Sequence, residues 1–343
     1  MAFPGNQYKL LALDLDGTLL NEKNQVSPRD AQAVRRAQER GVQIVLCTGR
    51  NVREVRAFSD QLLAPPDWLV TSSGAAVQRP QDAEPQFFSS LSLTHCEEIL
   101  ALCEEFETDP CLYTTQSLYY GGAFRALLRH LEQGGQIVMN EADEGYFYLD
   151  SHEKWLKALE SETLPFTKAV LYPSHDISDL LVSRLKHMGS FEIAPSVMFG
   201  GELHNIEINR RGVNKGQGLR WLAKELGCTM ENLAAIGDSD NDLTMLRAAG
   251  LGIAMANSGK NVRLTADAVT GSNTENGVAQ AIERYILEEK LGKKQLRSVS
   301  CSSTSCRSRR AARSTRCSSS SVWQAARPPM LRRQSRGSAA RRK

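Results

Sequence analysis

The segment LLALDLDGT at residues 10–18 joins a short apolar run to two acidic side chains. Four consecutive apolar residues, 10–13, are typical of a strand that is buried on both faces of a parallel sheet. The run ends at Asp14, and Asp16 follows two positions later, so both carboxylates come just beyond the strand. Ligands of open α/β sheets bind at this carboxyl edge, and Gly17 lets the chain turn away from it sharply.

The segments around this strand repeat an alternation of strand and helix. Ser27 and Pro28 predict the start of a helix, because serine caps free N–H groups and proline suits the first helical position. Further buried strands are expected at residues 42–46, 68–70, 233–236 and 251–255, and further helices at 52–62, 215–226 and 243–249. Strands and helices in this order imply a right-handed, doubly wound parallel sheet, which is an α/β fold.

Residues 82–201 follow a different pattern, in which strand-like pieces alternate irregularly with helical stretches. The strand-like pieces are residues 111–114, 169–171 and 191–194. We therefore expect an α/β core made of residues 1–81 and 202–290, with an α+β domain inserted between its two parts. Gly200 and Gly201 are the expected flexible points between the domains, since glycine absorbs dihedral change at little cost.

The last 53 residues, 291–343, differ sharply from the rest of the chain. They hold 15 of the 42 Lys and Arg residues and no Asp or Glu, which leaves 27 basic and 39 acidic residues before them, a net charge of −12. Ser, Arg, Ala and Cys dominate this tail without apolar periodicity, so we expect it to be disordered. A non-native extension, such as a shifted reading frame, is the favoured interpretation. Binding of RNA or an anionic surface is the alternative.

The composition of the body excludes several classes of protein. The acidic body has no evident basic cluster, so nucleic-acid binding is not expected there. No stretch approaches the roughly 20 apolar residues of a membrane span, and the start MAFPGNQYKL lacks a signal-peptide pattern, which predicts a cytoplasmic protein. The eight cysteines include no C-x-x-C pair, so we expect reduced thiols.

Two further polar groups lie at predicted junctions of strand and helix. Thr48 and Gly49 end the second strand, where a hydroxyl and backbone N–H groups suit a phosphate oxygen; a threonine that only caps the helix is the alternative. Lys215 begins a later helix, where a cation is unfavourable to the helix dipole. It is therefore expected to neutralise phosphoryl or carboxylate charge, with a solvated surface lysine as the alternative.

The segment GDSDND at residues 237–242 follows another predicted strand directly. Its three aspartates repel one another unless a cation or a lysine compensates them. Mg²⁺ is the natural partner, because it prefers oxygen ligands and commonly keeps waters and substrate phosphate oxygens. A calcium loop would need a longer ligand series that ends in a bidentate glutamate, and this segment has none.

Taken in order, DLDGT, TGR, Lys215 and GDSDND resemble the four motifs of the haloacid dehalogenase-like superfamily. The insert of about 120 residues is similar to the C2-type cap of its Cof-like sugar-phosphatase branch, and the resemblance covers residues 8–289. It implies a magnesium-dependent phosphatase whose cap closes over the core. The expected partner is a small phosphorylated metabolite such as a sugar phosphate.

The resemblance also implies catalytic and metal-binding roles, residue by residue. Asp14 would attack phosphorus and become an aspartyl-phosphate, while Asp16 would protonate the leaving oxygen and then activate water. The metal ligands would be Asp14, the backbone carbonyl of Asp16, and Asp238, with Asp242 close behind.

The phosphoryl oxygens would be held by Thr48, Gly49, Lys215 and Asn241. One position departs from the family pattern: Ser73 stands where members of the branch often have asparagine, in the segment TSSGA. This departure affects a substrate or loop contact and none of the four motifs.

Two other functions agree with parts of the sequence. A phosphomutase would share the aspartate nucleophile but return the phosphoryl group to its substrate. A regulatory protein would keep the site and bind RNA or another anion through the basic tail. His204, in the segment that follows the insert, is interpreted as a structural histidine, with a substrate contact as the alternative.

Overall fold

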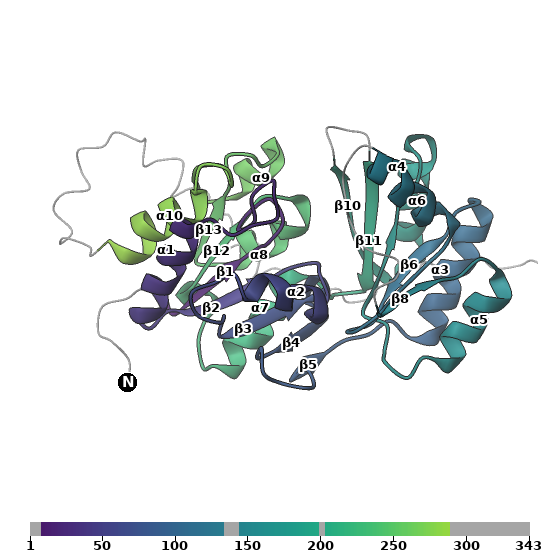
Figure 1. Cartoon of the computed structure of the whole chain (residues 1–343), viewed down its shortest axis with the longest axis horizontal. Coiled ribbons are helices and arrows are strands. Elements are labelled where there is room, and N and C mark those ends of the chain that lie inside the picture. Colours follow the sequence, from purple (N-terminus) through teal and green to yellow (C-terminus); the bar gives the residue numbers. More distant parts are fainter. Residues whose placement is uncertain (1–7, 134–143, 199–202, 289–343) are drawn as a thin grey trace, which may run out of the picture. The chain divides into compact units, whose positions relative to one another are not determined.

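The computed structural model describes residues 8–133, 144–198 and 203–288, which form two β-sheets with their helices (Figure 1). The predictions for the tail at 291–343 lie outside the described residues, as do the expected hinge points Gly200 and Gly201. In the described part, no helix combines the length and the apolar character that crossing a bilayer requires.

The first sheet has the strand order β14-β13-β12-β1-β2-β3-β4-β5 within the described residues. Its strands are β1 (Leu10–Leu13), β2 (Gln43–Cys47), β3 (Trp68–Thr71), β4 (Ala76–Gln78), β5 (Phe87–Phe88), β12 (Leu233–Gly237), β13 (Leu251–Ala254) and β14 (Ala268–Val269). The helices that accompany it are α1 (Pro28–Glu39), α2 (Val52–Ser59), α7 (Lys215–Glu225), α8 (Leu243–Ala248), α9 (Lys260–Thr265) and α10 (Gly277–Ile282).

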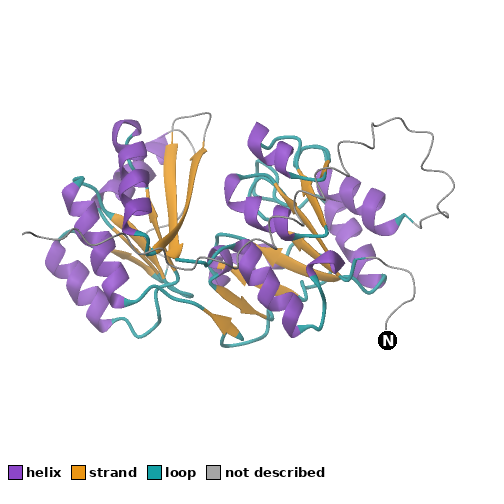
Figure 2. Cartoon of the chain, turned by 180° about the vertical axis from the view of Figure 1, so that it is seen from behind, coloured by secondary structure: helices purple, strands orange, loops and turns teal. Residues whose placement is uncertain are grey.

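Strand β1 is completely buried, as its apolar run predicts. Leu11 and Leu13 belong to a hydrophobic cluster with α1 and α10. Leu10 and Ala12 belong to a second cluster, with α7 and α8. Successive side chains of a strand point to opposite faces, so helices cover both faces of this sheet, as Figure 2 shows. The predicted doubly wound α/β fold is confirmed.

The pairing of β1 brings distant segments to one edge of the sheet. It lies between β2 and β12 and runs parallel to both, with Leu13 opposite Leu46 on one side and Ile236 on the other. Parallel strands end at the same edge, so Asp14, Thr48 and the loop after β12 all meet there.

The second sheet has the strand order β10-β11-β9-β6-β7-β8 in the described part, and only β7 and β8 pair in parallel. Its strands are β6 (Pro110–Tyr113), β7 (Leu118–Tyr120), β8 (Tyr146–Tyr148), β9 (Lys168–Leu171), β10 (Phe191–Met198) and β11 (Leu203–Arg210). Its helices are α3 (Leu93–Glu105), α4 (Gly122–Gln133), α5 (His152–Ser161) and α6 (His175–Met188).

The two faces of the second sheet have different coverings. Ala169 and Leu171 of β9 pack in a cluster with α3, α5 and α6. Val170 packs with α4 on the opposite face, and Lys168, two residues away, points to that same face. In β11, both chain neighbours of Glu207 belong to the cluster with α3, α5 and α6. Because successive side chains alternate between faces, Glu207 points to the opposite face, which it shares with Lys168.

Sheet membership differs from the expected domain boundaries at two short segments. Strand β5 pairs with β4 in the first sheet, although residues 82–88 were assigned to the insert. Strand β11 pairs with β9 and β10 in the second sheet, although residues 202–210 were assigned to the core. The apolar patterns of these segments predict strands but not the partner with which each strand forms hydrogen bonds.

Candidate active site

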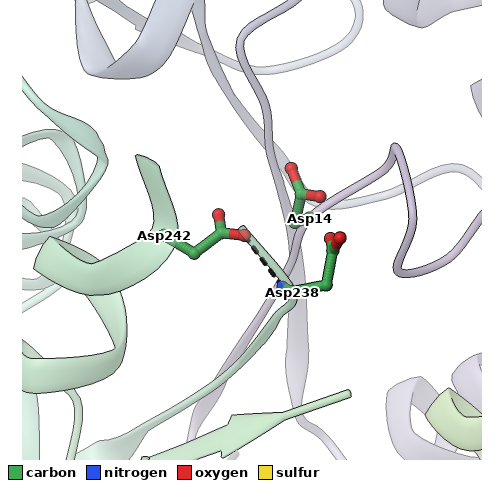
Figure 3. Close-up of side chains that lie close together, drawn as sticks. All are labelled: Asp14, Asp238 and Asp242. Carbon is green, nitrogen blue, oxygen red and sulfur yellow. Dashed lines mark hydrogen bonds between the residues drawn. The ribbon is translucent and has the colours of Figure 1, made fainter. Parts of the chain in front are cut away.

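The carboxyl edge of the first sheet gathers three carboxylates from two distant segments. One oxygen each from Asp14, Asp238 and Asp242 lies within 4.8 Å of the others (Figure 3). Asp14 directly follows β1, whereas Asp238 and Asp242 belong to the loop after β12. The convergence that the motifs predict is therefore present in the structure.

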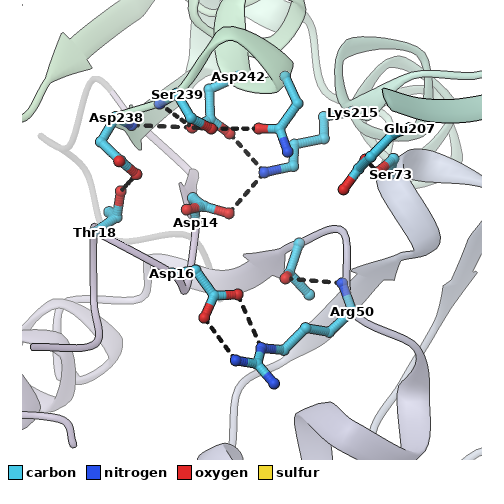
Figure 4. Close-up of polar contacts among 12 residues, drawn as sticks. Asp14, Asp16, Thr18, Arg50, Ser73, Glu207, Lys215, Asp238, Ser239 and Asp242 are labelled. Atoms are coloured by element: carbon cyan, nitrogen blue, oxygen red, sulfur yellow. Dashed lines mark hydrogen bonds and ion pairs between the residues drawn. The ribbon is translucent and has the colours of Figure 1, made fainter. Parts of the chain in front are cut away.

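Lys215 lies in the middle of this acidic group. Its Nζ donates hydrogen bonds to Oδ1 of Asp14 and to Oδ1 of Asp242, both at 2.6 Å (Figure 4). The Lys215 side chain is only 1% exposed, so the alternative of a solvated surface lysine is wrong. Asn214 caps α7 by accepting from the backbone N–H of Gln217, which fixes the helix start where Lys215 reaches the carboxylates.

Burial and mutual repulsion perturb the acids strongly. Burial raises the pKa of Asp14 well above its ordinary value, and the negative charge of Asp242 is the second-largest cause. Lys215 only partly opposes this rise. The same two causes raise the pKa of Asp238 to about 7. Burial alone would lower the pKa of Lys215, but Asp14 and Asp242 together raise it, so the ammonium stays charged. Three acids facing one lysine leave an excess of negative charge, which suits a divalent cation.

The oxygens of Asp242 already have partners within the protein. Its Oδ2 accepts hydrogen bonds from the backbone N–H groups of Asp238 and Ser239, both at 3.0 Å, and its Oδ1 accepts from Lys215. Asp242 therefore shapes the loop and positions the lysine. Oδ1 of Asp238 accepts from the Thr18 hydroxyl at 2.8 Å, which orients this carboxylate.

Gly17 makes the approach of Asp238 to the first loop possible. Its φ of +77° lies in the left-handed region, and a Cβ atom here would lie 2.4 Å from Oδ2 of Asp238. Any larger residue would be strained in its backbone and would displace the carboxylate. The glycine of DLDGT thus serves both the turn and the acidic group.

The Asp16 carboxylate lies outside the group of three. Arg50 binds it with two hydrogen bonds, from Nε at 2.9 Å and from Nη2 at 2.7 Å (Figure 4). The guanidinium also lies 4.6 Å from the centre of the Phe58 ring. Such a bidentate pair of arginine and carboxylate is a strong, charge-assisted interaction. The Asp16 side chain is nevertheless 48% exposed, so its carboxylate is accessible from solvent.

The expected phosphate-binding residues come from two loops, those after β2 and β12, and from the start of α7. The buried Thr48 accepts the backbone N–H of Arg50 with Oγ1 at 3.1 Å, and its own O–H has no acceptor among the described residues. The Asn241 Oδ1 accepts from the Ser239 hydroxyl at 2.7 Å. Gly49 lies beside Glu207, whose Oε1 would be 2.8 Å from a Cβ atom at position 49.

Ser73, the departure from the family pattern, has a defined contact. Its φ of 57° lies in the left-handed region, which asparagine tolerates better than serine does. Its hydroxyl donates a hydrogen bond to Oε2 of Glu207 in β11. Ser73, which stands where the family pattern often has asparagine, therefore contacts Glu207 of the second sheet.

Sequence reasoning gave no role to several residues that contact the site. Arg50 is the end of the TGR motif and Thr18 the end of DLDGT, and Glu207 belongs to no motif. Nothing in a local pattern says that Arg50 reaches Asp16 or that Glu207 reaches Ser73, 134 positions away. His204, interpreted as structural, contacts the ring of His175 at a centroid distance of 5.1 Å.

Comparisons with known proteins agree with this fold and site. Residues 11–282 match a family model described as haloacid dehalogenase-like hydrolase. The chain is 30% identical over 295 residues to Phosphatase YwpJ of Bacillus subtilis, covering 81% of this chain and 100% of that protein. It is 31% identical over 282 residues to the 5-amino-6-(5-phospho-D-ribitylamino)uracil phosphatase YcsE of the same organism, covering 81% and 96%.

A solved haloacid dehalogenase-like hydrolase from B. subtilis matches the structure with a TM-score of 0.70 and 30% identity, covering 81% of this chain and 100% of that chain. The chain belongs to the haloacid dehalogenase-like hydrolase family. The predicted resemblance to its Cof-like branch and the predicted enzyme class, a phosphatase, are confirmed.

Proposed function

We propose that this chain is a magnesium-dependent phosphatase that hydrolyses a small phosphorylated metabolite through an aspartyl-phosphate. The observation that carries this proposal is Lys215, buried and bound at 2.6 Å to both Asp14 and Asp242. An ammonium at this place neutralises charge where an anionic phosphate must approach a carboxylate nucleophile. Phosphoryl transfer depends mainly on such alignment and charge neutralisation.

Asp14 and Asp16 would divide the chemistry between them. An oxygen of Asp14 attacks phosphorus while the bond from phosphorus to the leaving oxygen breaks, and Asp16 gives that oxygen a proton. Water then attacks the phosphorus of the aspartyl-phosphate and loses a proton to Asp16, which releases phosphate and restores Asp14. Because Arg50 holds Asp16 in the structure, this role requires Asp16 to exchange the guanidinium for the leaving oxygen.

The acidic group fits Mg²⁺ by the chemistry of its donors. Asp14 and Asp238 would hold the ion together with the backbone carbonyl of Asp16, and Asp242 would support them from behind. Raised pKa values of Asp14 and Asp238 indicate that their negative charge lacks compensation within the protein. When bound, the ion would supply charge neutralisation and alignment of phosphate oxygens. Thr48, Gly49, Lys215 and Asn241 would hold the phosphoryl group from the protein side.

The second sheet and its helices would act as the C2-type cap over this site. The proposed core domain comprises the first sheet and its helices. The proposed cap comprises the segments between β5 and α7. Substrates would be bound between the two, and closure would exclude bulk water. Hydroxylated compounds such as sugar phosphates are the proposed substrates, and the ribityl phosphate named for the YcsE relative belongs in the test panel.

The test is a phosphate-release assay with Mg²⁺ and a panel of phosphorylated metabolites. We expect inorganic phosphate from at least one sugar or ribityl phosphate, with no release after chelation by EDTA and recovery on added Mg²⁺. Isomerised sugar phosphate without free phosphate would instead identify a phosphomutase. A cytoplasmic location remains a prediction, which fractionation of the source cells would test.

A further inference from the structure

Three polar atoms from separate segments converge beside Gly49. A Cβ atom at position 49 would lie 2.8 Å from Oε1 of Glu207, 3.4 Å from Nζ of Lys168 and 3.4 Å from Oγ of Ser73. Gly49 follows Thr48 at the end of β2, in the loop proposed to bind the phosphoryl group. Lys168 and Glu207 come from β9 and β11 of the second sheet, so this sheet contributes charged groups next to that loop.

Lys168 and Glu207 are both largely buried, and their mutual contact leaves hydrogen-bonding capacity unused. Their side chains are 5% and 13% exposed, and Nζ of Lys168 lies 3.3 Å from Oε1 of Glu207. The Lys168 ammonium also lies 4.9 Å from the centre of the Tyr113 ring. It carries three N–H donors, and among the described residues its Nζ has no hydrogen-bond acceptor besides Glu207.

Glu207 keeps its charge at this buried position. Burial would raise its pKa, but Lys168, the Ser73 hydroxyl and Lys215 together lower it. The contribution of Lys215 connects this pair with the acidic group, since the same ammonium binds Asp14. Figure 4 shows Glu207 and Ser73 beside Lys215. The neighbouring hydroxyl of Ser72 is buried and lacks a hydrogen-bond partner in the described part of the chain.

We propose that Lys168 and Glu207 form a specificity site, in which the ammonium donates to one hydroxyl of the substrate's leaving group and the carboxylate accepts from another. This inference rests on the proposed phosphatase function and assigns to it two residues for which neither the motifs nor the comparisons provide a role. The site consists of a cation, an anion and the Ser73 hydroxyl, all adjacent to the phosphate loop.

The chemistry of the pair favours a neutral, polyhydroxylated leaving group. A hydroxyl both donates and accepts hydrogen bonds, so adjacent hydroxyls can satisfy Lys168 and Glu207 together. Glu207 would repel a second anionic group on the substrate, and Lys168 would repel a cationic group. An apolar leaving group would leave desolvated charges without new partners. Sites built to bind a hydroxyl reject analogues that lack it for this reason.

A structural role is the rival explanation. Lys168 and Glu207 lie on neighbouring antiparallel strands, since β9 pairs with β11, and cross-strand ion pairs stabilise sheets. A structural pair would affect all substrates alike, because it would act through the stability of the sheet. A specificity site would instead change the preference between hydroxylated and hydroxyl-free substrates.

The test compares kcat/KM for ribose 5-phosphate and glucose 6-phosphate with kcat/KM for p-nitrophenyl phosphate, whose leaving group carries no other hydroxyl. In Lys168→Met and in Glu207→Gln, we expect the preference for the better sugar phosphate over p-nitrophenyl phosphate to fall roughly 10- to 100-fold. The double variant removes both charges and keeps the measurement available where one unpaired charge prevents folding. Thermal unfolding of each variant verifies that it folds.

Lys157→Met and Glu160→Gln are the matched controls, because both side chains are exposed on α5, a helix that packs on the second sheet. The preference should be unchanged in both. Equal losses for all three substrates in folded Lys168→Met would overturn the specificity site while leaving the phosphatase in place. If the unaltered protein released no phosphate from any of the three, or from the wider panel, the proposed function itself would fail and the specificity site with it.

Discussion

Two lysines of this protein, Lys215 and Lys168, are almost completely buried, but their surroundings differ. Lys215 binds two carboxylates at 2.6 Å and lies among acids supplied by the first sheet. Lys168 has one carboxylate at 3.3 Å and an aromatic ring beside it. The first lysine is surrounded by excess negative charge, whereas the second forms a balanced pair with hydrogen-bonding capacity to spare.

This difference suits the two regions to different roles in the proposed reaction. The region of Lys215 holds excess negative charge, which the proposed mechanism requires to be compensated before an anionic phosphate can react. The region of Lys168 contains matched charges and suits a neutral hydroxylated group. Chemistry and selectivity would thus be provided by different sheets, and variants in the two regions should fail in different ways.

Removing the proposed nucleophile, Asp14, should have the largest effect. Asp14→Asn is expected to lower turnover on every substrate by about 10³-fold or more, because an amide is a poor nucleophile at phosphorus. Phosphate release under saturating substrate measures it. Asp240→Asn is the matched control, since Asp240 lies exposed in the same segment as Asp238 and its Oδ1 accepts a hydrogen bond from Asn261. Activity of Asp14→Asn close to that of the control would contradict the proposed mechanism.

The two lysines themselves provide the next comparison. Lys215→Met should lower the free energy of unfolding by about 3–5 kcal/mol in denaturant titrations, because it leaves two buried carboxylates unpaired. It should also lower turnover on all substrates. Lys168→Met should cost only about 1–3 kcal/mol, since one partner is lost. Lys224→Met, at the exposed end of α7, should change stability by less than about 0.5 kcal/mol. Equal costs for Lys215→Met and Lys168→Met would remove the contrast.

Metal binding should depend on pH through the acidic group. Because the pKa of Asp238 rises from 3.8 to about 7 in the folded, metal-free protein, its contribution to stability is full below pH 4 and is lost as the pH rises to about 7. Mg²⁺ requires the ionised carboxylates, so its stabilising effect should increase over the same range. The difference in melting temperature between Mg²⁺ and EDTA should reach several degrees at pH 8 and be smaller at pH 5.

Asp238→Asn provides the control for this measurement. It should abolish most of the difference in melting temperature between Mg²⁺ and EDTA at both pH values, because it removes one of the two carboxylates proposed to hold the ion. A difference that is as large at pH 5 as at pH 8 in the unaltered protein would show that Asp238 does not control metal binding.

A smaller effect is expected where the two regions meet. Gly49→Ala would place a methyl group 2.8 Å from Oε1 of Glu207 and 3.4 Å from Nζ of Lys168. The neighbouring side chains must shift, so we expect kcat/KM to fall roughly 10-fold, in line with a small misplacement of binding groups. Gly259→Ala is the matched control, since a Cβ atom there meets nothing within 4 Å. Unchanged kinetics in Gly49→Ala would show that the pair does not confine this loop.

Much of the core was predictable because its signals are local. The apolar run of β1, the serine and proline at the start of α1 and the acidic loop after β12 each express a preference within a few residues. Parallel pairing then brings strand ends to one edge, so the meeting of Asp14 with Asp238 follows from the order of the elements. The sheet membership of β5 and β11 was not predictable in this way, because a strand pattern does not name its partner.

The sequence by itself determined the α/β core, the acidic group and the lysine that serves it, since these depend on short motifs at the ends of buried strands. Only the tertiary structure decided that Arg50 holds Asp16 and that Ser73 reaches Glu207. It alone also placed Lys168 beside Gly49, in the loop proposed to bind the phosphoryl group. The physical reason is that these contacts join side chains far apart in sequence, and their geometry arises only when each strand has found its neighbour and its side chains have been buried together.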